Sequence, residues 1–216
     1  MKRLLCLLLA SCSAPTLVAE HPLVTVRSPH ERGLVFVAWV TQHHGPRVAA
    51  ILGVEPRPVE VEVHDSLYLP HSSSGPHSSS GPQSSSGPHS ISGPYGALLT
   101  DGTIALAEAA LHDHGHFVAH ELAHAYLRDE SWHANLSQTL KEGVAEFASL
   151  LATEEIAAHR ELLASWPRDT EYSRGFQLVD RVGIEALRDL ALTGPVTEAR
   201  VAQLPAIASH GHFLPW

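Results

Sequence analysis

A hexamer repeat over residues 71–94 limits what the rest of this chain can fold into. Its unit is His-Ser-Ser-Ser-Gly-Pro, with Gln83 and Ile91 as the departures. Because the repeat has almost no apolar side chains, it cannot offset the entropy of ordering its backbone. We therefore expect a flexible insertion loop here, and we interpret its histidines as low-complexity composition rather than as a metal site.

The composition predicts one globular domain over residues 20–216, interrupted by the repeat. Hydrophobic residues make up 44% and charged residues 17% of the chain, which suits a packed core. The formal charge of -9, with lysine only at Lys2 and Lys141, argues against a nucleic-acid partner. Both cysteines, Cys6 and Cys12, precede the expected domain, so we expect no disulfide framework. Nothing in the sequence indicates an oligomeric state.

Residues 1–19 are typical of an export signal. A charged start at Lys2 precedes an apolar run from Leu4 to Ala10, which is too short to span a bilayer. Leu-Ala-Ser-Cys, ending at Cys12, resembles the lipobox of bacterial lipoproteins, which implies cleavage before Cys12, lipidation and membrane attachment. The alternative is cleavage after Ala19. The chain is then periplasmic or secreted, so both alternatives predict export.

The segment before the repeat predicts helices followed by a strand. Ser28 to Glu31 has the pattern of a capping box, so a helix should begin there and run to about His43. Gly45-Pro46 should break it, and residues 47–52 should add a short second helix. Apolar and charged residues alternate from Val59 to Val63, which is the period of a half-buried strand.

The segment after the repeat predicts a hairpin followed by helices. Asp101-Gly102 is a turn signal between residues 98–100 and 103–106. Helical periodicity is expected near 114–128, 138–151, 154–164, 171–181, 184–192 and 196–203. With strands first and helices last, the sequence predicts an α+β fold in which a small N-terminal β-sheet packs on a mostly helical half.

His120-Glu121-Leu122-Ala123-His124 forms an HExxH motif on the first of these helices. Residues four apart lie one turn above each other, so both imidazoles can bind one ion while Glu121 reaches a water molecule beside it. Zinc suits two imidazoles and a carboxylate with a fourth position open. The next predicted helix offers two candidate carboxylates, Glu142 and Glu146.

The HExxH motif followed by Glu142-Gly143-x-Ala145 resembles the Glu-zincin metallopeptidases, especially the bacterial peptidase MA-like proteins. The resemblance implies a zincin-type helical half with Zn²⁺ held by His120, His124 and Glu142. It implies Glu121 as general base for hydrolysis of a peptide or protein substrate. Glu146 is then a hydrogen-bond partner of a ligand histidine, or the alternative ligand.

Three matters stay open at the level of sequence. Tyr126 and Tyr172 are candidates for stabilising the oxyanion, with core packing as the default for both. His112, His114 and His116 can form an accessory metal site or, as we expect, a polar loop. The alternative to an enzyme is a non-catalytic exported protein that uses zinc for stability or scaffolding.

The two cleavage hypotheses predict different mature N-termini. Lipidation predicts a chain that begins at acylated Cys12 and a Cys12→Ser variant that leaves the membrane fraction, because the acyl chains are lost. Cleavage after Ala19 predicts that both variants begin at Glu20 and stay out of the membrane fraction. Mass spectrometry of the N-terminal peptide, with membrane fractionation, distinguishes them; a wild-type chain beginning at Glu20 contradicts lipidation.

Overall fold

The protein is described by a computed structural model that covers residues 16–65, 91–92, 96–99, 101–112, 115–165 and 170–207. Its sheet has the strand order β1-β2-β3-β6-β5-β4. The strands are β1 (Leu17–His21), β2 (Val24–Ser28), β3 (Val59–His64), β4 (Ile91–Ser92), β5 (Gly96–Leu98) and β6 (Ile104–Ala107). Strands β2, β3 and β6 are parallel neighbours, and the other pairs are antiparallel.

The strand and hairpin predicted from the sequence are confirmed. Along β3 the side chains of Val59, Val61 and Val63 are buried, whereas Glu60 is exposed, as the alternation predicts. The hairpin joins β5 to β6 through Asp101-Gly102, and the Leu99 amide donates a hydrogen bond to the Thr103 carbonyl at 2.8 Å.

Most of the helices also lie where the sequence predicts them. They are α1 (Glu31–Leu52), η1 (a 3-10 helix, Glu108–His112), α2 (His116–Leu127), α3 (Ser131–Ala134), α4 (Gln138–Ala152), α5 (Ile156–Ser165), α6 (Glu171–Val182), α7 (Ile184–Leu192) and α8 (Glu198–Ala202). The two short elements η1 and α3 were not predicted. No helix among the described residues is long and apolar enough to cross a membrane.

The predicted break at Gly45-Pro46 is wrong, because α1 runs through Pro46 without interruption. A proline inside a helix removes one backbone hydrogen bond. Here Val48, Ala49 and Leu52 beyond it are all buried, so packing on the core holds the last turns in place. The predicted start is wrong as well. Ser28 ends β2, and the helix begins at Glu31 with His30 as its N-cap.

The N-terminal strands β1 and β2 were missed by the sequence prediction. Residues 17–19, which cleavage after Ala19 would remove, form the first part of β1. Their backbone pairs with residues 26–28 of β2. The order of elements is therefore interleaved, with α1 connecting the parallel strands β2 and β3, rather than strands first and helices last.

The predicted insertion loop ends earlier than the sequence indicated. Ile91–Ser92 forms β4 and pairs with residues 97–98 of β5. Ile91 is one of the positions at which the repeat departs from its unit. Residues 66–90, which hold most of the predicted loop, lie outside the described residues, as do 1–15 and the predicted lipidation site Cys12.

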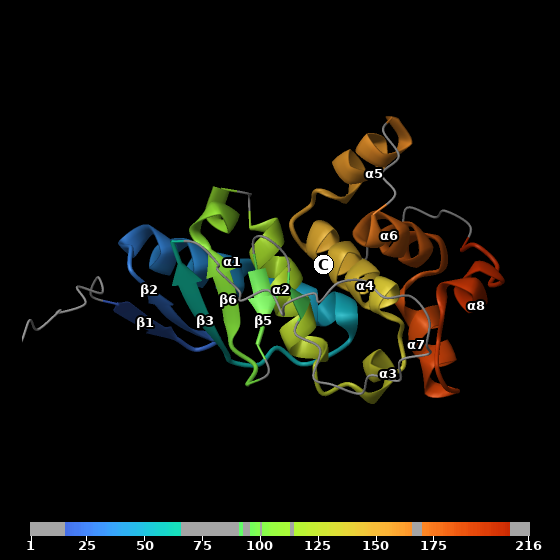
Figure 1. The fold of residues 1–216 in the computed structure, drawn as a ribbon, viewed down its shortest axis with the longest axis horizontal. Helices are drawn as coiled ribbons and strands as arrows, with labels where there is room; N and C mark the ends of the chain where they lie inside the picture. Colours follow the sequence, from blue (N-terminus) through green and yellow to red (C-terminus); the bar gives the residue numbers. More distant parts are fainter. Residues whose placement is uncertain are drawn as a thin grey trace, which may run out of the picture.

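The fold is α+β, as predicted, with the sheet at one end and α5 to α8 at the other (Figure 1). Helix α1 packs on β2 and on α2, and α2 contacts β5 and β6. Helix α4 packs on both α2 and α1, and α6 packs on α4 (Figure 1). The pair α2 and α4 therefore forms the junction between the sheet and the helical half.

Two glycines allow α4 and α6 to approach closely. A Cβ atom on Gly143 would lie 2.6 Å from the Cα atom of Gly175, and one on Gly175 would lie 2.8 Å from the Cα atom of Gly143. Real Cβ atoms essentially never come this close to backbone. The glycine of the Glu-Gly-x-Ala stretch is thus required by helix packing and fixes α4 against α6.

Gly143→Ala should lower the free energy of unfolding by about 1–3 kcal/mol, because two backbones must move apart. Gly45→Ala on α1 is the matched control, since its Cβ would meet side-chain atoms and no backbone, the nearest being the Tyr126 hydroxyl at 2.9 Å. In both variants, replacing glycine by alanine within a helix stabilises the helix intrinsically by about 0.8–1 kcal/mol, so this effect cancels in the comparison. Urea unfolding of the metal-free variants measures the difference. Equal stability of the two variants would contradict the close-contact explanation.

Candidate metal centre

A row of histidines on α2 faces a row of glutamates on α4. His116, His120 and His124 are spaced four apart on α2, and Glu142 and Glu146 are spaced four apart on α4. This spacing places each set on one helical face. Glu146 contacts His116 and His120, and Glu142 contacts His120 and His124, so the two helices cross with antiparallel register.

The predicted ligand atoms converge on one point. His120 Nε2 lies 3.1 Å from His124 Nε2 and 3.3 Å from Glu142 Oε2, and His124 Nε2 lies 3.4 Å from the same oxygen. Ligands bound to zinc at about 2.0–2.1 Å in tetrahedral geometry lie about 3.3 Å apart. The three atoms therefore have the spacing of three ligands of a single ion, and this group can hold a metal.

The interior around these atoms suits a charged centre. His120, His124 and Glu142 are 6%, 1% and 2% exposed. Gln138 donates a hydrogen bond from Nε2 to Glu142 Oε1 at 2.6 Å, which leaves Oε2 directed at the imidazoles. Gln138 was not predicted from the sequence, although it lies one helical turn before Glu142.

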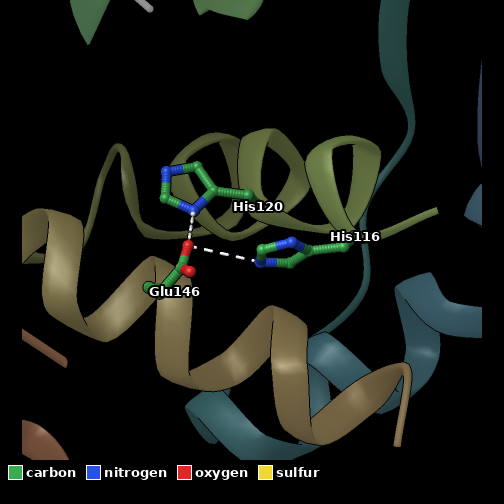
Figure 2. Close-up of side chains that lie close together, drawn as sticks. All are labelled: His116, His120 and Glu146. Carbon is green, nitrogen blue, oxygen red and sulfur yellow. Dashed lines mark hydrogen bonds and ion pairs between the residues drawn. The ribbon is translucent and has the colours of Figure 1, made fainter. Parts of the chain in front are cut away.

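The alternative ligand Glu146 lies on the other side of His120. Its Oε2 accepts a hydrogen bond from His120 Nδ1 at 3.1 Å, and the second ring nitrogen of His120 points away from it (Figure 2). A carboxylate on Nδ1 fixes the tautomer that leaves Nε2 able to bind a metal. Glu146 is therefore placed to orient His120.

Glu121 lies beside the cluster without contacting Glu142 directly. Its side chain packs on Gly96 of β5, where a Cβ atom would lie 2.8 Å from Glu121 Oε1. Burial is the main influence that raises the pKa of Glu121, while the neighbouring His120 and His124 act in the opposite direction. A raised pKa brings a carboxylate closer to the pH at which a general base works best.

The metal-free cluster is held together by charge. Burial alone would lower the pKa of His120, but hydrogen bonds with Glu142 and Glu146 outweigh it and raise that pKa to about 10. Burial would raise the pKa of Glu142, but its bonds to His120 and His124 lower it to about 2. The pKa of Glu146 is lowered by His116 and His120, again against the effect of burial.

The two candidate tyrosines lie in different surroundings. The Tyr126 side chain is fully buried, and its hydroxyl faces Gly45 of α1, away from the ligand cluster. The Tyr172 ring lies 5.7 Å from the His120 ring between centroids, and the side chain is partly exposed. Burial and the neighbouring carboxylates raise the pKa of Tyr172 to about 12, so its hydroxyl keeps its proton at neutral pH.

The sequence prediction missed or misplaced several histidines near the centre. His116 begins α2 and contacts Glu146, so the polar-loop interpretation is wrong for this residue. His159 on α5 approaches Glu146 Oε1 to 4.0 Å. His133 on α3 lies near His124, and burial lowers its pKa to about 3. His114 of the predicted loop lies outside the described residues, and the side chain of His112 is not described.

Comparisons of this chain with protein-family models, with curated proteins and with solved structures gave no match.

The affinity for Zn²⁺ should rise with pH. The raised pKa of His120, about 10 against an ordinary 6.5, keeps the ring protonated at neutral pH, so a binding ion must displace that proton. Displacement of one proton gives about a tenfold gain in apparent affinity per pH unit between about pH 6.5 and 8. Competition with a chromophoric chelator measures the slope. A constant affinity over this range would show that the ion displaces no proton from His120, which would contradict its raised pKa.

Proposed function

We propose that this chain is a zinc-dependent hydrolase that cleaves peptide bonds. His120, His124 and Glu142 hold the ion, and Glu121 is the general base. The observation that carries the proposal is the convergence of three ligand atoms, 3.1–3.4 Å apart, with a buried carboxylate beside them. The HExxH motif that supplies three of these four residues adds independent support.

The residues around the ion each have a distinct part in hydrolysis. Bound zinc supplies a Lewis acid that polarises the scissile carbonyl and makes a water molecule more acidic. Glu121 accepts a proton from the attacking water and then donates it to the leaving amine. The Tyr172 hydroxyl, protonated at neutral pH, is suited to donate a hydrogen bond to the developing oxyanion.

The presence of Glu121 favours catalysis over a purely stabilising zinc site. A structural site needs four protein ligands, whereas three ligands with a general base leave a position for water. The packing of Glu121 on the glycine backbone of β5 holds the carboxylate close to the ligand cluster without making it a ligand. A stabilising site would gain nothing from a buried carboxylate with a raised pKa at this position.

We also propose that the chain is exported and anchored through a lipid on Cys12. The resemblance of residues 9–12 to a lipobox is the first support. The second is β1, because cleavage after Ala19 would remove residues 17–19, which pair with β2. A mature chain that begins at Cys12 keeps this strand whole.

Substitution of the two carboxylates should separate chemistry from metal binding. Glu121→Gln should keep zinc but lose about 10²–10⁴-fold in peptidase activity, because an amide cannot act as a base. Glu142→Ala should lose zinc and activity together, since two imidazoles remain. The exposed Glu60→Gln on β3 is the control and should change neither. Zinc content and cleavage of casein, peptides and cell-wall peptides are measured on the same samples.

These measurements distinguish a zinc peptidase from a non-catalytic zinc-binding protein. If zinc-loaded wild type cleaves none of these substrates, the chain is better described as a non-catalytic zinc-binding protein. If Glu121→Gln retains wild-type activity, the general-base assignment is wrong. If Glu142→Ala retains zinc and Glu146→Ala loses it, then Glu146 is the ligand and the assignment of the two carboxylates is reversed.

A further inference from the structure

The carboxylate of Glu146 lies among three imidazoles. His116 Nε2 lies 3.2 Å and His120 Nδ1 lies 3.1 Å from its Oε2 atom, and His159 Nε2 lies 4.0 Å from its Oε1 atom. Figure 2 shows His116 and His120 directed at the same carboxylate oxygen. The side chains of His116, His159 and Glu146 are 12%, 18% and 11% exposed, so this cluster belongs to the interior.

Each of the two outer imidazoles is oriented by an aromatic neighbour. The His116 ring stacks on Phe117, with 5.5 Å between centroids. The His159 ring meets Phe176 edge-on, with 4.7 Å between centroids, and so links α5 to α6 beside α4. These contacts restrict the rings without occupying the edge that faces Glu146. A buried carboxylate stays in one position only if fixed partners surround it, and both rings lie within ion-pair distance of Glu146.

We propose that His116 and His159 are positioning residues that hold the Glu146 carboxylate, so that Glu146 in turn fixes the His120 ring for metal binding. The inference rests on the proposed zinc centre. Both histidines approach the Glu146 carboxylate, and the His116 ring also meets the His120 ring edge-on, with 6.5 Å between centroids. In this proposal the carboxylate, and not the ring contact, carries their effect on zinc binding. Outer carboxylate partners of ligand histidines typically change metal affinity by about 10–100-fold.

A second metal ion at His116, His120 and Glu146 is the competing explanation. One donor atom from each of these residues lies within 4.8 Å of the others. Such an ion would need His120 Nδ1 while Nε2 holds the first ion, so the ring would have to lose both of its protons. The hydrogen-bonded arrangement needs only the neutral ring, which donates from Nδ1 and binds through Nε2. It is therefore favoured.

The experiment compares variants by zinc dissociation constant, measured by chelator competition, and by zinc content per chain. His116→Leu should weaken zinc binding about 10–100-fold. His116→Gln keeps an N–H donor and should recover most of that loss. His159→Leu should give a smaller loss, in keeping with its longer distance. The matched control is His44→Gln on α1, a partly buried histidine bonded to the Ala152 carbonyl, which should bind zinc like wild type.

A double-mutant cycle tests whether His116 acts through Glu146. In a Glu146→Ala background, His116→Leu should cause no further loss of affinity, because the carboxylate that it positions is gone. The visible spectrum of the Co²⁺-loaded variants reports the ligand geometry and should change in His116→Leu and Glu146→Ala alike. A purely structural part for His116 predicts full loss in both backgrounds and no rescue by glutamine.

Three results overturn the inference. The first is unchanged zinc affinity in His116→Leu, the second is additive losses in the cycle, and the third is two zinc ions per wild-type chain that fall to one in His116→Leu. If wild type binds no zinc, the proposed function fails and this inference fails with it. If zinc binds without peptide cleavage, only the catalytic proposal fails, because the double-mutant cycle measures zinc affinity and does not depend on cleavage.

Discussion

The contact between the imidazoles of α2 and the carboxylates of α4 is the interaction on which the rest of this structure depends. His120, His124, Glu142 and Glu146 are all buried, and buried charge is stable only when it is paired. The spacing of four on each helix gives each of these side chains a partner on the opposite helix. Rotation of either helix would bring apolar residues into the contact between α2 and α4 and would leave buried charges unpaired.

The surroundings of this contact fix it from both sides. On the helical side, the glycine pair at positions 143 and 175 lets α6 press directly on the backbone of α4. On the sheet side, Gly96 of β5 brings backbone against Glu121, so that the carboxylate lies between the sheet and the two histidines. The centre thus belongs to neither half alone. A change in how the sheet packs on the helices would move Glu121 relative to Glu142.

The sequence predicts this centre better than it predicts the fold around it. Helical periodicity of four relates His120 to His124 and Glu142 to Glu146, and the resemblance of the Glu-Gly-x-Ala stretch to the Glu-zincins singled out Glu142 as the third ligand. Residues linked only by tertiary contact escaped prediction. His116 faces Glu146 because α4 happens to turn that face toward α2, and Pro46 stays in a helix because the residues beyond it are buried. Local rules for turns and loops carry no information on either.

The charges of the metal-free cluster favour a cation at its centre. Lowered pKa values keep Glu142 and Glu146 ionised, and the raised pKa of His120 places a positive charge between them. A low-dielectric interior disfavours unpaired charge, so a cation that replaces the His120 proton can take over the pairing of the buried carboxylates. The same carboxylates that are stable in the interior only when paired therefore make the group of His120, His124 and Glu142 able to hold a metal ion.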